Sequence, residues 1–99
     1  MGIKYSKAQA LKIIKRILKN GSYGSTKHFR KRMKERHLDI HDVLHVINNG
    51  NIYNEPEIHP KTGKWTYTVE GKIIDDQGIK IAIDIHEEID RIIILTVMI

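Results

Sequence analysis

The sequence predicts an α+β fold in which three N-terminal helices pack on a four-stranded antiparallel meander sheet. Hydrophobic residues recur at helical spacing before residue 50, whereas the later segments have the alternation or the composition of strands. The loops between the predicted strands are short, and short loops favour antiparallel neighbours. A chain of 99 residues with 40% hydrophobic content supports one modest core, so residues 1–99 are predicted to form a single domain.

The helices are predicted at about residues 6–20, 26–37 and 40–49. Ser6, with Gln9 three residues later, forms a capping box that begins the first helix. Thr26 or the serine before it begins the second helix, and Asp39 caps the third. An Asn-Gly pair ends the first and the third helix. Residues 22–25, between the first two helices, are predicted to be a short loop.

The strands are predicted at about residues 52–58, 64–74, 79–86 and 91–99. Pro56 makes the first of them an edge strand, because proline donates no hydrogen bond to a ladder. Gly71 is expected to mark a bulge in the second strand. The third strand alternates isoleucine with polar residues, which predicts one dry and one polar face. The fourth is apolar almost throughout, as expected for a central strand covered on both faces.

Charge is divided unequally along the chain. Residues 1–50 hold 12 Lys and Arg against 3 Asp and Glu, a net charge of +9, whereas residues 51–99 hold 5 against 9, a net charge of −4. A cationic helical half suggests a surface that holds a polyanion, for which nucleic acid is the first candidate. The absence of cysteine excludes a disulfide framework, a zinc finger and thiol catalysis. No apolar run approaches the roughly 20 residues of a membrane span, so no membrane partner is expected.

The second predicted helix is the main candidate site. His28, Arg32 and Arg36 follow one another at four-residue intervals, which places them on one flank of the helix beside its buried stripe. Arginines held in this way suit bidentate recognition of a phosphate, and we expect His28 to act as a general acid or base. Lys27 and Lys31 lie on the solvated side and are expected to bind RNA. An ordinary basic helix, with arginines that cover the core, would explain the same pattern.

The polar face of the predicted sheet supplies further candidates. Thr96 is the one hydroxyl in an apolar strand and could contact a phosphate oxygen. Tyr67 could orient the phosphate, although an aromatic residue at such a position more often belongs to the core. Lys80 and His86 alternate with isoleucine on the third strand and are expected to bind RNA. No metal site is predicted, because a pair of histidines at 41 and 45 has no third ligand nearby.

The sequence has no phosphate-binding glycine loop, no nucleophile elbow and no metal triad, so we expect neither a cofactor nor a metal. RNA supplies its own nucleophile, the 2′-hydroxyl. A side-chain base can deprotonate this hydroxyl while cations stabilise the pentacoordinate phosphate and an acid protonates the leaving oxygen. A small basic domain can therefore cleave RNA with His, Arg, Lys and Tyr side chains alone.

Four short motifs allow a comparison with known families: Thr26-Lys-His28-Phe-x-x-Arg32-Met-x-x-Arg36, Asp42-Val43 with Ile47-x-Asn49-Gly50, Tyr67-x-Val69-Glu70-Gly71-Lys72, and Ile94-Leu95-Thr96-Val97. Over residues 25–99 they resemble a bacterial family of domains of unknown function that is grouped with the RelE/ParE-like toxins. The order of elements is similar to that of MqsR-type toxins and of the C-terminal nuclease domains of contact-dependent inhibition toxins.

The resemblance implies a RelE-like, barnase–colicin-type fold and metal-independent cleavage of tRNA or mRNA. It assigns His28, Arg32, Arg36, Tyr67 and Thr96 to the catalytic site. It also implies a neutralising antitoxin or immunity protein, and action in the bacterial cytoplasm, either as a free toxin or as the C-terminal part of a toxin secreted by another cell. The chain lacks the basic tail and the catalytic tyrosine of ribosome-dependent RelE, which leaves free tRNA a reasonable substrate. A non-catalytic nucleic-acid-binding or regulatory module of a toxin–antitoxin locus remains the alternative.

Overall fold

A computed structural model describes residues 3–99 of the chain as one α+β unit. The helices are α1 (Lys7–Asn20), α2 (Lys27–Glu35) and α3 (Ile40–Asn49), with a short 3-10 helix η1 (Glu87–Ile89). The strands are β1 (Ser22–Ser25), β2 (Glu57–Ile58), β3 (Trp65–Lys72), β4 (Gly78–His86) and β5 (Arg91–Met98). They form one five-stranded sheet in the order β1-β5-β4-β3-β2, so the predicted class is confirmed while the four-stranded meander is wrong in detail.

The helix caps lie where the sequence predicts them. The Ser6 hydroxyl accepts a hydrogen bond from the Gln9 backbone N–H at 3.1 Å, and the Gln9 side chain accepts one from the Ser6 N–H at 3.0 Å. Asp39 and Asp42 exchange the same pair of bonds at the start of α3. These contacts satisfy backbone donors that a helix leaves without partners at its N-terminus. The second helix ends at Glu35, two residues earlier than predicted.

The segment predicted to be a loop between the first two helices is strand β1. Ser22 pairs with Arg91 and Ser25 with Ile94, so β1 runs parallel to β5 at the edge of the sheet. The four residues Ser-Tyr-Gly-Ser carry no apolar alternation and remain largely exposed. Because their partners lie at the other end of the chain, the pairing follows from where α1 and α2 hold this segment, and no local signal predicts it. The other strand pairs are antiparallel.

Two further expectations about the strands are corrected. The strand predicted at 52–58 is reduced to Glu57–Ile58, because the residues around Pro56 form no regular ladder. The segment before Pro56 meets β3 at a backbone bridge between Asn51 and Glu70 and at a hydrogen bond that the Asn54 side chain donates to the Glu70 carboxylate. The bulge expected at Gly71 lies instead between β4 and β5. Ala82 opposes Thr96 and Ile83 opposes Ile94 there, which leaves Leu95 as the extra residue. At Gly71 a Cβ atom would come within 3.1 Å of the Gly50 Cα, so close packing explains this glycine.

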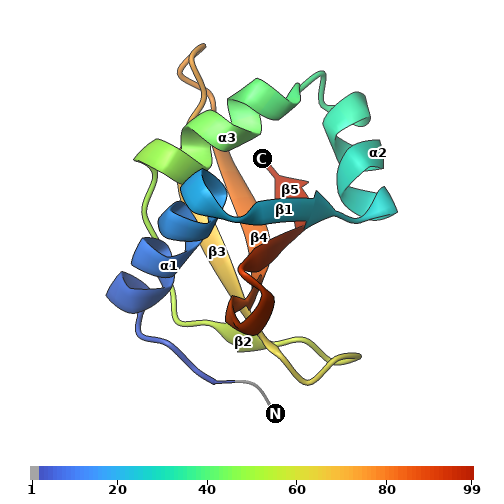
Figure 1. The fold of residues 1–99 in the computed structure, drawn as a ribbon. Coiled ribbons are helices and arrows are strands. Elements are labelled where there is room, and N and C mark those ends of the chain that lie inside the picture. Colours follow the sequence, from blue (N-terminus) through green and yellow to red (C-terminus); the bar gives the residue numbers. More distant parts are fainter. Residues whose placement is uncertain (1–2) are drawn as a thin grey trace.

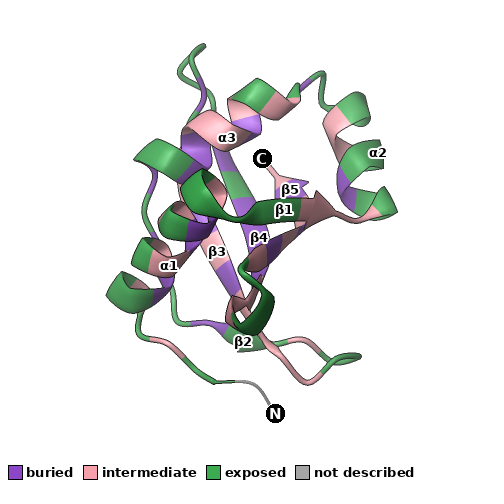
Figure 2. Cartoon of the chain, in the orientation of Figure 1, coloured by how far each residue is buried: buried purple, intermediate pink, exposed green. Residues whose placement is uncertain are grey.

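All three helices contribute to covering one face of the sheet (Figure 1). Helix α3 packs against β3 and β4, α1 against β1, β4 and β5, and α2 against β5. The strand residues that point to this covered face join the core: Tyr67, Val69, Ile79, Ile81, Ile83, Ile92, Ile94 and Val97. Figure 2 shows the buried residues where helices and strands meet, with exposed residues on the outer sides of the helices.

The opposite, open face carries the alternate residues of the same strands. It includes Thr66 and Thr68 from β3, Lys80, Ala82 and Asp84 from β4, and Thr96 from β5, as the pairing register requires. The alternating side-chain direction predicted for β4 is confirmed: Ile81 and Ile83 are fully buried under the helices, while Lys80, Ala82 and Asp84 point to the other side. Ala82 and Asp84 are also buried, so the open face is exposed only in part. The apolar β5 lies inside the sheet, between β1 and β4.

Candidate functional site

A groove of about 520 Å³ lies where the open face meets the first turn of α2, and we call it the α2 groove. Its walls carry His28 from α2 together with His59 and Lys61 from the turn between β2 and β3, and its floor includes Thr66 and Thr96. Three segments that are remote in sequence thus contribute to one site. None of the lining residues is acidic, so the groove suits an anionic ligand.

The start of α2 is fixed by the bulge in β5. The Thr26 hydroxyl accepts a hydrogen bond from the Phe29 N–H at 3.0 Å and donates one to the Leu95 carbonyl at 2.7 Å. Leu95 is the bulged residue, whose backbone is displaced from the regular ladder. Phe29 is fully buried and sets the rotation of the helix about its axis. Together these contacts place the exposed side chain of His28 at the rim of the groove.

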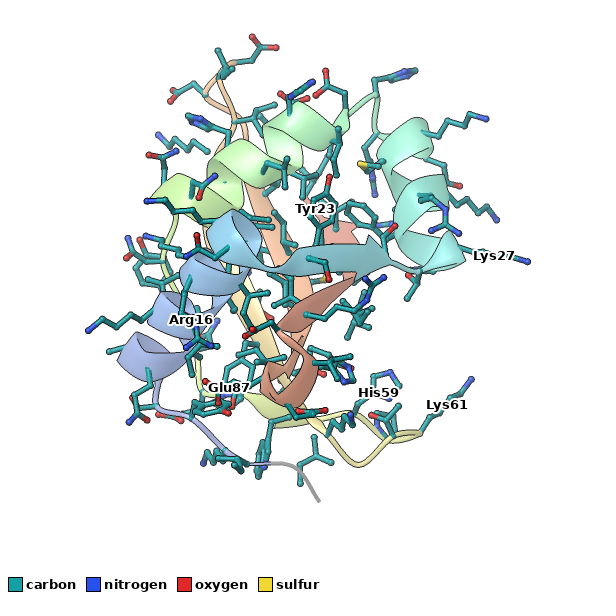
Figure 3. The ribbon with its side chains drawn as sticks, in the orientation of Figure 1. Arg16, Tyr23, Lys27, His59, Lys61 and Glu87 are labelled. Carbon is teal, nitrogen blue, oxygen red and sulfur yellow. The ribbon has the colours of Figure 1, made fainter. Side chains whose placement is uncertain are left out.

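The opposite wall is a turn that is held by its own backbone. The His59 N–H donates to the Lys64 carbonyl at 2.8 Å, and the Gly63 N–H donates to the His59 carbonyl at 2.9 Å. Gly63 has a φ of +70°, which favours glycine. The Lys61 N–H donates to His59 Nδ1 at 3.2 Å, so a neutral His59 carries its proton on Nε2 and is a hydrogen-bond donor. Figure 3 shows His59 and Lys61 on this turn, on the same side of the view as Lys27.

The predicted catalytic residues are only partly brought together. His28 and Thr96 line the same groove. Arg32 and Arg36 follow His28 at four-residue steps, each of which turns the helix direction by about 40°, and neither lines the groove. Arg32 is half-buried, and Arg36 is exposed at the C-cap. Within residues 3–99 neither arginine side chain takes part in an ion pair, so both guanidinium groups are available to a ligand.

Tyr67 lies on the other side of the sheet. Its side chain is 1% exposed on the covered face, and its hydroxyl accepts a hydrogen bond from the Tyr5 N–H at 2.7 Å. Burial raises the pKa of Tyr67 above its usual value. The sheet separates this residue from His28 and Thr96, because odd and even positions of a strand point to opposite faces. Its position in the core accounts for its presence in the sequence.

None of the predicted RNA-binding residues lines the groove. Lys27 and Lys31 are exposed on α2. Lys80 lies on the open face, where its Nζ is 3.9 Å from a Glu70 carboxylate oxygen. His86 lies at the other end of β4, with Nδ1 3.0 Å from the Nζ of Lys64. A lysine ammonium only donates, so a neutral His86 carries its proton on Nε2.

Sequence reasoning missed His59, Lys61 and Thr66 as groove residues. A histidine and a lysine in the turn His59-Pro-Lys-Thr-Gly63 were visible, but nothing local indicates that this turn faces the start of α2. Thr66 follows the strand alternation, but its place in the groove depends on strand register. It lies on the open face one position further along the strands than the paired residues Ala82 and Thr96.

A second hollow, of about 210 Å³, lies near the N-terminal segment and includes Tyr5, Glu87 and Glu88 in its lining. The Tyr5 hydroxyl donates to Glu87, and this hydrogen bond is the main reason that the pKa of Tyr5 is raised to about 12. Arg16 Nη2 lies 3.1 Å from the other Glu87 oxygen, and both labelled partners appear in Figure 3. Two carboxylates make this hollow unsuitable for a polyanion, and its hydrogen bonds hold the N-terminal segment to the domain.

The family described as Domain of unknown function (DUF4258) matches residues 25–99. The match covers most of the chain, so the chain belongs to this family. Every segment that lines the α2 groove lies within the match, whereas α1 lies outside it. Searches of curated proteins and of solved structures found no significant match.

The described residues 3–99 contain no group of three or more His, Cys, Asp or Glu side chains placed to hold a metal ion. In the same residues, none of the helices has the length and apolar character needed to cross a membrane.

Proposed function

We propose that this domain is a metal-independent endoribonuclease toxin of the RelE/ParE-like, barnase–colicin type, which cleaves RNA through the 2′-hydroxyl. The observation that carries the proposal is the α2 groove, where His28, His59 and Lys61 line one hollow together with hydroxyl and apolar side chains, and no lining residue is acidic. The layout of helices on one face of a largely antiparallel sheet, with the other face open, supports the same class.

His28 is the proton-transfer group of the proposed reaction. Its side chain makes no hydrogen bond or ion pair within residues 3–99, so a ring nitrogen is free to take the proton of the 2′-hydroxyl. The 2′-oxygen then attacks the phosphorus, the bond to the 5′-oxygen breaks, and a 2′,3′-cyclic phosphate forms while the 5′-oxygen takes a proton from water. Lys61 and the Nε2 proton of His59 are placed to stabilise the negative charge of the pentacoordinate phosphate, and the Thr96 hydroxyl can orient it.

The remaining basic residues bind the RNA on either side of the scissile phosphate. Arg32 and Arg36 continue along α2 beyond His28, and Lys27 and Lys31 lie on its exposed side. His86 extends the open face in the other direction. Contacts of this kind to phosphates raise affinity for any sequence and weaken as salt is added. Tyr67 is left out of the mechanism, because it lies across the sheet.

The same proposal includes a substrate, a partner and a place of action. The substrate is tRNA or mRNA in the bacterial cytoplasm, and the domain reaches it either as a free toxin or as part of a toxin delivered from another cell. A chain with a formal net charge of +5 suits an acidic antitoxin or immunity protein that covers the groove.

A non-catalytic RNA-binding module is the second candidate function. It is favoured by the exposed lysines of α2, which need no groove to neutralise phosphates.

The test is inducible expression in a bacterium, followed by separation of total RNA on a gel and incubation of the purified chain with the same RNA in excess chelator. Wild type is expected to stop growth and to fragment tRNA or mRNA with or without chelator. His28→Ala should abolish cleavage while leaving RNA affinity within a small factor. His41→Ala is the matched control, because His41 is also an exposed helical histidine but lies outside the groove.

Lys61→Ala is expected to lower the cleavage rate by roughly 10²–10³, the loss that follows removal of a group stabilising transition-state charge. Cleavage at the wild-type rate by His28→Ala would overturn the mechanism. RNA binding without any cleavage by the wild-type chain would replace the enzyme with the non-catalytic module, and affinity should then fall steeply with salt and follow the number of Lys and Arg residues.

A further inference from the structure

We infer that Thr66 determines base specificity in the α2 groove, where it accepts a hydrogen bond from an N–H group of a nucleobase while Asp84 fixes the direction of its hydroxyl. A base bound at Thr66 presupposes a nucleic-acid ligand, so the inference rests on the proposed function in that respect. The contact that supports it, between Thr66 and the buried Asp84 carboxylate, plays no part in the proposed cleavage mechanism.

Asp84 is the buried charged residue of the described chain, with 4% of its surface exposed. It lies on the open face of β4, directly opposite Thr66 of β3. The Thr66 hydroxyl donates a hydrogen bond to Asp84 Oδ1 at 2.9 Å. An ionised carboxylate has only acceptor positions, so the single proton of the Thr66 hydroxyl is committed to Asp84.

The lone pairs of the Thr66 oxygen remain for a ligand, and Thr66 lines the α2 groove. This end of the groove therefore presents a hydrogen-bond acceptor with a negative charge directly behind it. A phosphate group also offers only acceptors and is repelled by the Asp84 charge, so it is excluded from this position. A ligand group that donates from nitrogen is favoured there, and in RNA such groups are found on the edges of the bases.

The rest of the groove fits the faces of a base. Pro60, Ala82 and Leu95 supply apolar lining, and the small Ala82 side chain leaves room above the sheet. The volume of about 520 Å³ falls within the roughly 300–1,000 Å³ of sites that hold small organic groups. Lys61 supplies the cationic side and lies in the same groove as His28, so one nucleotide can place its base edge at Thr66 and its phosphate beside Lys61.

The experiment measures binding, because binding does not depend on cleavage. Short fluorescent 2′-deoxy strands, which have no 2′-hydroxyl to attack phosphorus, are titrated with the purified full chain. Each strand carries either an ordinary base or an analogue that lacks one N–H donor: purine for adenine, hypoxanthine for guanine, 2-pyrimidinone for cytosine and N3-methyluracil for uracil. We expect at least one pair to differ roughly tenfold or more in Kd, as a specific base contact does.

Three variants assign the difference to Thr66. Thr66→Val keeps the shape and removes the acceptor, so it should erase the discrimination, whereas Thr66→Ser should keep it. Asp84→Asn can donate its amide to the Thr66 oxygen and release the hydroxyl proton towards the groove, so it should weaken or invert the preference. Thr68→Val is the matched control, since Thr68 occupies the next open-face position of β3 and does not line the groove. Circular dichroism checks that each variant is folded.

The outcomes separate this inference from the proposed function. Discrimination that Thr66→Val removes supports the inference even if the chain cleaves no RNA, in which case only the nuclease proposal fails. Cleavage of RNA together with equal affinity for every pair overturns the inference alone. Discrimination that survives in Thr66→Val assigns the base contact to another residue and also overturns it. Failure to bind any strand overturns the inference alone, because the proposed function is judged by cleavage of RNA, which carries the 2′-hydroxyl.

Discussion

The two faces of the sheet use the same strands in different ways. On the covered face, Ile81 and Ile83 are fully buried under the helices. On the open face, their neighbours Ala82 and Asp84 form part of the floor and support of the α2 groove. The backbone ladder is common to both, so the difference arises only from what lies above each face. Burial of apolar surface makes the covered face the main source of stability, while the open face can carry polar groups that a ligand could contact.

This comparison predicts that stability and ligand binding can be changed separately at adjacent positions of one strand. Substitutions on the covered face should lower the free energy of unfolding. Substitutions in the groove should alter RNA affinity or cleavage and cost less stability. Four sets of variants test these expectations about stability and binding, in order of decreasing expected effect.

The largest effect is expected for Ile83→Ala on the covered face. Ile83 is fully buried, and removing its side chain leaves a cavity, so the free energy of unfolding should fall by about 2–5 kcal/mol. The adjacent Ala82→Leu should fill the groove and lower RNA affinity at least tenfold, while costing less stability than Ile83→Ala, about 1–3 kcal/mol, because Ala82 is buried at the groove and not under the helices. Urea unfolding and RNA titration measure both quantities. Equal loss of stability in the two variants would contradict the separation of the faces.

A smaller effect is expected where α3 meets β3. A Cβ atom on Gly50 would lie 2.4 Å from the Glu70 carbonyl oxygen, a contact that requires the backbone to move. Gly50→Ala should therefore cost roughly 1–3 kcal/mol of unfolding free energy, as overpacking does. Gly78→Ala is the control, because no atom lies within 4 Å of a Cβ at that position. Thermal unfolding should show a lower midpoint for the first variant only.

A cost of about 1–2 kcal/mol is expected for Thr26→Val. This change removes the cap of α2 and the hydrogen bond to Leu95, which together fix the wall of the groove. Thr26→Ser should retain both bonds and most of the stability. RNA cleavage by Thr26→Val should fall more than its stability predicts, because His28 is displaced. Cleavage unchanged from wild type would show that the anchoring of α2 does not position His28.

The smallest effect concerns the N-terminal segment. The hydrogen bond to Glu87 raises the pKa of Tyr5 to about 12, from about 10 in the unfolded chain. Below pH 10 both states hold the proton and the stabilisation is complete; it is lost as the pH rises towards 12, because the unfolded chain releases the proton first. Glu87→Gln should lower the Tyr5 pKa, as measured by tyrosinate absorbance. Tyr5→Phe should flatten the loss of stability above pH 10, whereas Tyr53→Phe at an exposed position should not.

The helices could be predicted from sequence because their signals are local. The Ser6–Gln9 pair and Asp39 act within one turn of the helix that they cap, and the apolar spacing of α1 and α3 is recorded in the chain itself. The alternation of β4 is equally local and fixed the two faces of the sheet in advance. For the candidate site, His28 and Thr96 were predicted, and both line the groove.

Other features depend on contacts between remote segments. Strand β1 exists because its four weakly patterned residues lie beside β5, and Leu95 is the bulged residue because of the register between β4 and β5. Neither contact has a signature in a short window of sequence. The position of Tyr67 on the covered face follows from strand register, because the register decides whether the odd or the even residues of β3 point towards the helices.

The sequence by itself determined the α+β class, the helix caps, the polar and apolar sides of the third predicted strand and the basic character of the N-terminal half, since each of these is a property of neighbouring residues. Only the tertiary structure decided that His59 and Lys61 line one groove with His28, that Thr66 donates a hydrogen bond to Asp84, and that Arg32 and Arg36 stay outside the groove. The physical reason is that a site formed by several segments depends on how the chain folds back on itself, and this is set by the packing of the whole core.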